Sequence, residues 1–531
     1  MKRIAYFCME YGLHNDFKIY AGGLGILAGD YLKGAQDHNY PIIGVGLKWK
    51  QGYTDQMIDA EGHPYDTYHN YNYEKYLEPT GVTVSVEIRN RIILCKVWKV
   101  TSFGNAPLFL LDTDLPENAD AWITGQLYGW FGEERVAQEM VLGIGGIRAL
   151  RALNIPVDVY HFNEGHALFA GFELLREEMD TGTKFKKAVC RVKEQIVFTT
   201  HTPVIQGNES HPIELLTYMG ANLHLKEKHL KKLGGSPFNM TVGALNLSRK
   251  ANAVAALHGK TANEMWAHVP KDCDIIPITN AIHQPTWVDG KLQKLLDQPD
   301  QLWERHQKNK RDLIQFLKAR TGAEFHPNVL LLGFSRRAVP YKRADLIFDD
   351  PSIIEPLLKQ RRLQLIFSGK AHPLDDTGKG IVFQLMQWCK KYPNAVAFLE
   401  NYDMTIGAQL VRGADVWLNN PRRPMEASGT SGMKAAMNGV LNFSTLDGWW
   451  PEACQHGITG WQMGDGFEST DPDLQRAHDR AALYQVLLKE IIPTYYEDNQ
   501  KWKKMMVASI MATSKEFDIK RMLDDYYEKL Y

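Results

Sequence analysis

The sequence contains few cysteines for its length, and those few lie far apart. Six occur among 531 residues, and no two have the C-x-x-C spacing that is typical of a structural zinc site. They are Cys8, Cys95, Cys190, Cys273, Cys389 and Cys454. This pattern excludes a dense disulfide scaffold and favours a reducing compartment.

A long apolar run is also missing. The chain opens with MKRIAYFCMEYG, which has no apolar core of a signal peptide, and Arg148 and Arg151 interrupt an apolar stretch before it could span a bilayer. We therefore expect a cytoplasmic protein that has no membrane partner.

An excess of charge of one sign is the third absence. The 61 basic residues nearly balance the 62 acidic ones, so the sequence predicts no nucleic-acid partner. A hydrophobic fraction of 44% and a charged fraction of 23% are typical of globular proteins, and the length predicts two or three domains. Aromatic residues make up 11% of the chain, and some lie beside Gly and Asn in loops, where flat rings suit sugars.

What is present is an alternation of short apolar runs with helical patterns, which predicts parallel sheets. The first series of predicted strands is 3–8, 41–47, 157–162 and 195–199, with helices at 26–37, 133–153 and 167–178. The pattern pauses at 269–277 and restarts with strands at 328–334, 363–368, 395–399, 416–418 and 440–443. Amphipathic residues 479–531 predict several closing helices. Two α/β domains of similar size are expected.

The segment EASGTSGMK, residues 426–434, places small residues directly before Lys434 and a helical pattern. Consecutive backbone N–H groups at such a helix start form an anion site that suits phosphate. Lys434 is either a point charge on that phosphate or an amine that forms a Schiff base with an aldehyde. A loop that merely caps a helix, with a solvated lysine, is the alternative.

The segment GFSRRAVPYKR, residues 333–343, leaves a predicted strand with four cations, Arg336, Arg337, Lys342 and Arg343. Cations at the carboxyl end of a parallel strand lie where α/β proteins bind ligands and can neutralise a dianion. A solvated surface is the alternative.

The segment AGGLGILAGD, residues 21–30, formally matches the G-x-G-x-x-A pattern of dinucleotide sites. A dozen residues separate it from the preceding strand, and no acidic residue lies near position 43. A glycine loop that approaches a phosphate or a sugar fits better than a dinucleotide site.

Three shorter segments place polar groups after apolar runs. They contain Asn163, Glu164 and His166; His201; and Asn280, His283 and Trp287. His161 and His166 do not have the spacing of a zinc helix, and no cysteine is near, so we expect no metal.

Together these segments resemble the α-glucan (glycogen/maltodextrin/starch) phosphorylase family, especially its short prokaryotic branch. The resemblance also rests on GVGLKWKQGY, FSGKAHP and FLENYDM, and it covers nearly the whole chain in the family's order. It implies an α/β glycosyltransferase B fold, in which two Rossmann-like domains face a central cleft. The implied domains are 1–270, 271–510 and a C-terminal helix, 511–531, that returns to the first domain.

The resemblance implies phosphorolysis of α-1,4-glucans with retention, which gives α-D-glucose 1-phosphate, by a homodimer that carries pyridoxal 5'-phosphate as a Schiff base on Lys434. The cofactor's phosphate would act as the acid and base. The implied cofactor-binding residues are Lys434, Arg336, Tyr402, Thr430, Ser431 and Gly23. The implied substrate-binding residues are Gly22, Gly23, Asn163, Asn280, Tyr341, Glu426, Ser428 and Gly429. The implied catalytic residues are Lys434, Arg337, Lys342 and His201.

Some positions depart from the family pattern. Ala281 follows Asn280 where glycine is typical, Pro340 precedes Tyr341, and Asn208 with Glu209 replaces a His-Asp pair. Two alternatives therefore stay open, a nucleotide-sugar glucan synthase and a non-catalytic glucan-binding protein of the same fold. The chain is shorter than the animal and yeast enzymes, and we expect it to lack their regulatory segments.

Overall fold

A computed structural model of the chain describes residues 1–269 and 274–531. Its contacts divide it into two units. Unit 1 comprises Met1–Thr54, Tyr68–Thr279 and Met522–Tyr531, and unit 2 comprises Asp55–Thr67 and Asn280–Arg521. The predicted domain boundary after residue 270 and Cys273 both fall outside the described residues, and the predicted domain limits stay a prediction.

Unit 1 is built on one large mixed sheet, with the strand order β13-β12-β9-β8-β1-β2-β7-β6-β5 in the described part of the chain. The strands are β1 (Ile4–Phe7), β2 (Ile42–Leu47), β5 (Glu78–Ile88), β6 (Arg91–Val100), β7 (Leu108–Asp112), β8 (Val159–Asn163), β9 (Ile196–Thr199), β12 (Lys250–Ala253) and β13 (Ile275–Pro277). β1 pairs in parallel with both β2 and β8, and β5, β6 and β7 pair in antiparallel fashion. The four strands predicted for this half are confirmed; each is an apolar run that the sheet buries.

Helices of unit 1 follow these strands. They are α1 (Gly23–Asp37), α2 (Glu133–Met140), α3 (Gly146–Ala152), α4 (Phe169–Asp180), α5 (Phe185–Lys193), α6 (Ile213–Met219), α7 (Glu227–Gly234), α8 (Met240–Leu247) and α9 (Ala256–Met265). A short two-stranded ribbon pairs β10 (Ser210–His211) with β11 (Phe238–Asn239). The predicted helix 133–153 forms as α2 and α3, joined by a wider helical turn at Val141–Gly145.

Residues 522–531 complete the core of unit 1. The side chain of Tyr531 is buried, and its hydroxyl lies 2.7 Å from Nδ1 of His161 and also bonds the hydroxyl of Tyr31 on α1. The backbone oxygen of Tyr531 accepts a hydrogen bond from Lys2. α20 (Ile519–Asp525) leads into this segment.

Unit 2 is built on a parallel sheet with the order β16-β15-β14-β17-β18-β19 in the described residues. Its strands are β14 (Leu331–Ser335), β15 (Gln364–Ser368), β16 (Val396–Leu399), β17 (Val416–Asn419), β18 (Leu441–Thr445) and β19 (Gly460–Met463). Five of them confirm the predicted second series. β3 (Asp55–Ile58) and β4 (Pro64–Thr67) form an antiparallel hairpin that also belongs to unit 2.

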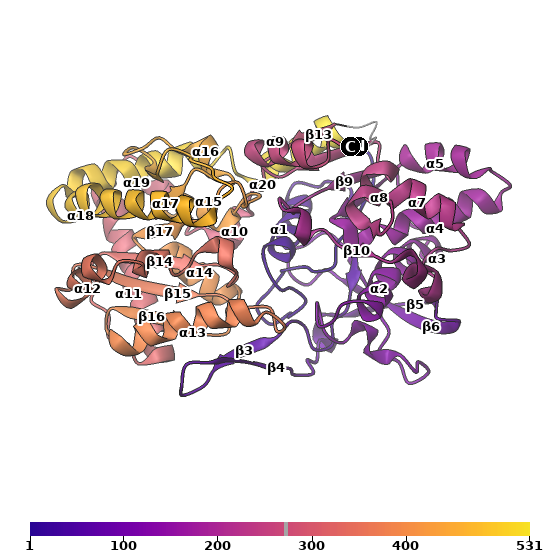
Figure 1. Cartoon of the computed structure of the whole chain (residues 1–531), viewed down its shortest axis with the longest axis horizontal. Coiled ribbons are helices and arrows are strands. Elements are labelled where there is room, and N and C mark those ends of the chain that lie inside the picture. The colour runs from indigo at the N-terminus through magenta and orange to yellow at the C-terminus, as the bar shows by residue number, and fades with distance from the viewer. Residues whose placement is uncertain (270–273) are drawn as a thin grey trace. The chain divides into compact units, whose positions relative to one another are not determined.

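Helices surround the strands of this sheet (Figure 1). Alternate residues of the sheet enter two apolar cores, which explains why the strands are apolar on both faces. One core contains Leu332 and Leu365 with side chains of α12 (Pro351–Lys359), α13 (Asp376–Lys391), α17 (Pro472–Val486) and α19 (Asn499–Thr513). The other contains Leu331 and Ile366 with side chains of α11 (Pro299–Thr321), α14 (Met404–Gly413) and α15 (Thr430–Met437). The remaining helices are α10 (Gln284–Trp287), α16 (Trp450–Ala453) and α18 (Ile492–Glu497). Unit 2 is therefore a doubly wound sheet, whose ligand sites lie at the carboxyl ends of the strands.

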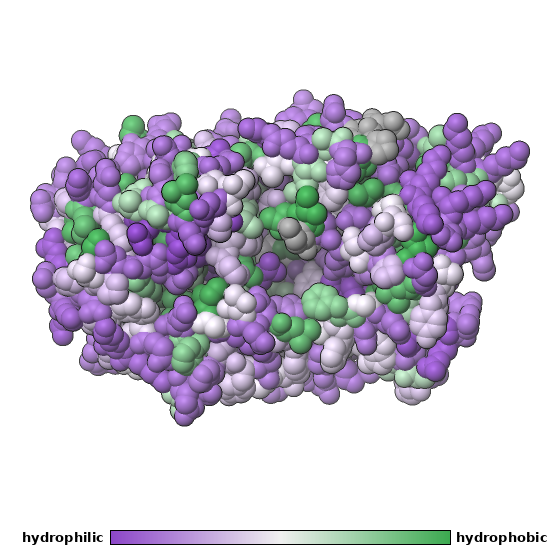
Figure 2. Space-filling model, viewed as in Figure 1, coloured by the Kyte–Doolittle hydropathy of each residue, from purple (hydrophilic) through white to green (hydrophobic). Residues whose placement is uncertain are grey.

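The surface in view is mainly hydrophilic, and its apolar side chains are scattered among polar ones (Figure 2). Among the described residues, no helix combines the length and the hydropathy that a membrane crossing requires.

Candidate active site

In unit 2, three neighbouring strands deliver polar segments to one edge of the sheet. Residues 336–343 follow β14, residues 420–434 follow β17, and Asp447 follows β18. These strands are adjacent in the order β14-β17-β18, so the segments meet. This edge is the carboxyl edge, as the sequence predicts for the cations that follow β14.

Glu426 lies at the centre of this edge. Its Oε2 accepts hydrogen bonds from Arg336 Nη2, at 2.5 Å, and from Lys342 Nζ. Burial alone would raise the pKa of Glu426, but the charges of Arg336 and Lys342 outweigh it and lower that pKa to about 2. Glu426 is therefore ionised at neutral pH. It can accept hydrogen bonds from sugar hydroxyls but cannot serve as a general acid.

Asp447 is a second carboxylate at this edge, and sequence reasoning did not single it out. It is fully buried and accepts hydrogen bonds from the backbone N–H groups of Glu426, at 2.9 Å, and Gly448, at 2.8 Å. Burial and the charge of Glu426 raise the pKa of Asp447 to about 8. Two neighbouring carboxyl groups thus differ in charge at pH 7, and Asp447 fixes the backbone of Glu426. The only signal in the sequence was its place directly after a predicted strand.

The small-residue segment forms the predicted helix start. Gly429 precedes α15 with a φ of +86°, a left-handed conformation that favours glycine. Arg336 Nη1 donates to Ser431 Oγ at 3.0 Å, and Trp417 Nε1 contacts the same hydroxyl at 3.3 Å. A guanidinium thus lies beside a helix N-terminus, and both attract an anion.

Lys434 lies one turn into α15 and is buried, with 5% of its surface exposed. Its Nζ lies 3.6 Å from the centroid of the Trp287 ring, a cation–π distance. The lysine is therefore not the solvated side chain of a simple capping loop. Its amine is held at a fixed place one turn from the anion-binding helix start.

The other cations of residues 336–343 differ in their surroundings. Arg337 is exposed, and within the described residues no hydrogen bond or ion pair of its side chain is seen. Arg343 is buried and bonds Asp479 at 2.8 Å and the backbone oxygens of Asn420 and Pro421. Arg343 is therefore a structural residue, whereas Arg337 has a guanidinium available for an anion.

The remaining predicted residues of unit 2 lie on nearby segments. Lys342 Nζ is 4.7 Å from the centroid of the Tyr341 ring. Ser428 Oγ and Asn280 Oδ1 are buried and make no hydrogen bond with any described residue. Burial raises the pKa of Tyr402 to about 12, and a Cβ at Gly407 would lie 2.6 Å from the Tyr402 hydroxyl, so the glycine makes room for that ring.

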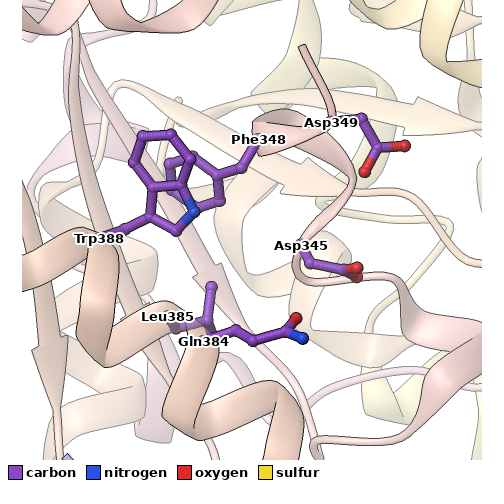
Figure 3. A pocket seen from close by; sticks show the side chains of 6 residues that line it. All are labelled: Asp345, Phe348, Asp349, Gln384, Leu385 and Trp388. Atoms are coloured by element: carbon purple, nitrogen blue, oxygen red, sulfur yellow. The ribbon is translucent and has the colours of Figure 1, made fainter. Parts of the chain in front are cut away.

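A pocket of unit 2 is lined by side chains of residues 345–349 and of α13 and by none of the predicted site residues (Figure 3). Its volume is about 130 Å³, and its lining includes Asp345, Asp349 and Trp388. Arg476 donates hydrogen bonds to both aspartates, so the charge of its guanidinium is already neutralised. Carboxylates at its mouth disfavour an anion, and the pocket is not a phosphate site.

In unit 1, the ends of β8 and β9 bring Asn163, Glu164 and His201 together. Nε2 of His201 lies 2.6 Å from Asn163 Oδ1, and Glu164 accepts a hydrogen bond from the backbone N–H of His201. Burial, with the nearby His258 and His166, lowers the pKa of His201 to about 3. His201 is therefore neutral at pH 7, and its Nε2–H donates to Asn163.

The predicted glycine loop of unit 1 is bound by a carboxylate. Oε2 of Glu10 accepts hydrogen bonds from the backbone N–H groups of Ala21, at 2.6 Å, and Gly22, at 3.0 Å, and α1 begins at Gly23. A Cβ at Gly25 would lie 2.5 Å from Glu10, so this position requires glycine. Glu10 thus occupies the Gly22 N–H that was expected to face a substrate. Sequence reasoning missed Glu10 because nothing in its spacing links it to residue 22.

Comparisons with known proteins agree with this geometry. A sequence model of the family described as "Carbohydrate phosphorylase" matches residues 290–455, which include the segments that follow β14 and β17. The maltodextrin phosphorylase of Thermococcus litoralis is 40% identical, over 99% of this chain and 70% of that protein. The glycogen phosphorylase of Mycobacterium bovis is 36% identical over the same shares, 99% and 70%. An uncharacterized protein of Methanocaldococcus jannaschii is 36% identical over 100% of both chains.

Proposed function

Because the chain belongs to the carbohydrate phosphorylase family, we propose that it is an α-1,4-glucan phosphorylase, a glycosyltransferase that uses inorganic phosphate to release α-D-glucose 1-phosphate. The observation that carries the proposal is the set of cations around Glu426 and the start of α15. Arg336 and Lys342 both bond Glu426, and Arg336 also reaches Ser431 on the helix. The names of the relatives, maltodextrin and glycogen phosphorylase, support the same reaction. The doubly wound sheet of unit 2 supports the glycosyltransferase B fold, which we also propose.

The residues of unit 2 fit pyridoxal 5'-phosphate, the proposed cofactor. An aldehyde needs a buried amine, which Lys434 supplies, and a phosphate needs backbone N–H groups and a cation, which the start of α15 and Arg336 supply. Thr430, Ser431 and the ring of Tyr402 complete the proposed binding residues, with Gly23 as a further candidate. When bound, the cofactor supplies a phosphate whose second pKa lies near neutrality and which can exchange a proton.

In phosphorolysis, the bond between C1 of the terminal glucose and the glycosidic oxygen breaks and a phosphate oxygen bonds C1. The departing oxygen takes up the proton of the attacking hydrogen phosphate and becomes a hydroxyl. In this proposal Arg337 and Lys342 hold the attacking phosphate and stabilise its charge. The ionised Glu426, Asn280, Tyr341 and the backbone of Ser428 and Gly429 hold the glucosyl hydroxyls. Glu426 has no role as a proton donor because its pKa is about 2.

Unit 1 supplies hydrogen-bonding groups for the sugar in the same proposal. His201 is neutral, so it binds a hydroxyl and does not transfer a proton at pH 7. Asn163 orients its ring, and Gly23 stays a proposed substrate contact. For Gly22 the proposal is that a substrate shares the N–H that bonds Glu10. The homodimer and the cytoplasmic location also stay predictions.

A phosphorolysis assay tests the function directly. The purified chain, saturated with pyridoxal 5'-phosphate, is incubated with phosphate and maltodextrin, and glucose 1-phosphate is measured by a coupled enzyme. We expect release that requires phosphate. Turnover of ADP-glucose without phosphorolysis would instead establish a glucan synthase, and glucan binding without turnover would establish a binding protein.

Arg337→Ala is expected to raise the KM for phosphate by roughly 10- to 100-fold, because a hydrogen-bonded guanidinium–anion contact contributes about 1.5–3 kcal/mol. The side chain is exposed and makes no hydrogen bond or ion pair with any described residue, so the melting temperature should not change. Arg311→Ala, which removes another exposed arginine of unit 2, is the matched control. An unchanged KM for phosphate in Arg337→Ala would remove Arg337 from the phosphate site.

A further inference from the structure

Unit 1 contains a buried cluster of two carboxylates and two imidazoles that the proposed reaction does not use. Glu139 is on α2, His166 lies directly after β8, Glu209 precedes β10, and His211 is on β10. One ligand atom from each of Glu139, His166 and Glu209 lies within 4.8 Å of the others. Nε2 of His211 lies 3.3 Å from Glu139 and 3.9 Å from Glu209.

The cluster is partly buried, and much of its bonding capacity is unused. Glu139 and His211 have 0% and 7% of their side chains exposed, and His166 and Glu209 have 16% and 24%. Both carboxylate oxygens of Glu139, Oε2 of Glu209 and Nε2 of His211 make no hydrogen bond with any described residue. Buried polar atoms normally have partners, so this arrangement of unpartnered atoms favours the binding of a further group.

The charges of the cluster also need a cation. Arg135 bonds Glu209 through the other carboxylate oxygen and neutralises one of the two acids. Two carboxyl groups thus lie beside one guanidinium, and either a proton shared by the two acids or a metal ion balances the second acid. Two imidazoles and two carboxylates form a donor set that borderline divalent metals prefer.

From this geometry we propose that Glu139, His166, Glu209 and His211 bind one divalent transition-metal ion, with Zn²⁺ as the best match. Tetrahedral zinc with bonds of about 2.0–2.2 Å holds its ligand atoms roughly 3.3–3.6 Å apart. Nε2 of His211 lies 3.3 Å from Oε2 of Glu139 and 3.9 Å from Oε2 of Glu209, which is close to this spacing. Nε2 of His166 lies 3.7 Å from Oε1 of Glu209, the oxygen that Arg135 bonds, so a turn of the His166 ring or of the Glu209 carboxylate would complete the set. Arg135 would stay on the second oxygen of Glu209, as an outer partner that orients the ligand.

This proposed site differs from the pair His161 and His166, which the sequence analysis rejected as a metal site. Both ring nitrogens of His161 are within bonding distance of other groups, Tyr531 and Thr199, so His161 is not a partner of His166. The partners of His166 come instead from residues 139, 209 and 211, which sequence spacing does not connect. Glu209 is also one of the two residues, with Asn208, that replace a His-Asp pair of the family pattern.

A bound metal would tie α2 to the segments around the proposed sugar-binding residues. His166 lies two residues after Glu164, and its ring is 5.7 Å from that of Tyr128. The hydroxyl of Tyr128 donates to Glu10, the carboxylate that binds the glycine segment. The metal is therefore a structural ion that positions these groups, and no catalytic step is assigned to it.

Metal uptake by the full chain tests the site without reference to activity. The protein is stripped with a chelator and dialysed against ZnCl₂, and bound zinc is measured by mass spectrometry. We expect one zinc per chain in the wild type and at least tenfold less in Glu139→Gln and His211→Asn. Glu173→Gln is the control. It removes the charge of another fully buried glutamate of unit 1, which pairs with Arg148 and Arg176, and it should bind zinc as the wild type does.

The wild type alone gives a second test, which holds even if the variants do not fold. Its melting temperature should rise by roughly 5 °C with saturating Zn²⁺ and not with Mg²⁺. Co²⁺ should give the strong visible absorption of a tetrahedral site. Absence of zinc from the wild type, or equal uptake by a folded Glu139→Gln chain, would overturn the proposal and leave a carboxyl pair that shares a proton.

Discussion

Lys434→Arg is expected to lower the rate of phosphorolysis by roughly 10³-fold or more and to abolish covalent attachment of pyridoxal 5'-phosphate, although it keeps the positive charge. The sequence left two roles for Lys434, a point charge on phosphate and an amine that holds an aldehyde. A guanidinium can replace the first role but not the second, because it stays protonated and is a poor nucleophile. The variant therefore separates the two roles.

Borohydride reduction followed by peptide mass measurement reads out the attachment. The wild type should carry the cofactor's mass on the peptide that contains Lys434. Lys318→Arg, at an exposed lysine of α11 that pairs with Glu324, should react and label as the wild type does. A cofactor that stays covalently bound to the Lys434→Arg chain would show that another residue holds it.

Glu426→Gln is expected to lower the free energy of unfolding by roughly 3–5 kcal/mol and the rate of phosphorolysis by roughly 10²-fold or more. The substitution leaves Arg336 and Lys342 buried beside each other without their shared carboxylate. It also removes a hydrogen-bond acceptor from the proposed sugar site.

Added phosphate distinguishes a structural role from a binding role of this glutamate. An anion restores negative charge to the two cations, so phosphate should raise the melting temperature of Glu426→Gln more than that of the wild type. Glu173→Gln is the matched control, because Glu173 is also a buried glutamate between two arginines, Arg148 and Arg176. An equal response to phosphate in both variants would contradict the assignment of Arg336 and Lys342 to an anion site.

The pH dependence of unfolding gives an independent check on Glu426. Its pKa in the folded state, about 2, lies below the ordinary value of 4.5. The stability that this group contributes is therefore present above pH 4.5 and is lost as the pH falls toward 2. The difference in stability between the wild type and Glu426→Gln should shrink over that window.

The sequence predicted nine strands of the two large sheets, because these strands are short, apolar and separated by helical patterns, but it missed β7, β12, β13 and β19. It also predicted that residues 336–343 and 426–434 lie at strand ends. It did not predict the antiparallel strands β5 and β6, because their alternating residues face partly exposed surroundings and carry many charges. Such strands are specified by their partners more than by their composition.

The sequence also did not predict which residues, far apart in the chain, bond each other in the fold. Arg343 looked like a ligand-binding cation until Asp479, far along the chain, proved to bond it. Asp447 and Glu10 are single acidic residues in loops, and a loop has no hydrophobic periodicity that would mark them. Their importance comes from burial and from the backbone groups that they bind, and neither property can be read from spacing.

Tyr531 is buried in the same aromatic cluster as His161 and Tyr31, so the core of unit 1 joins segments that are synthesised far apart in time. Because residues 522–531 follow the whole of unit 2 in the chain, the ribosome makes them after that unit can already have folded. Unit 1 thus stays incomplete during most of synthesis, and Tyr31 and His161 must wait for their aromatic partner Tyr531. A fragment cut after residue 279 would expose this aromatic cluster to water and to other chains.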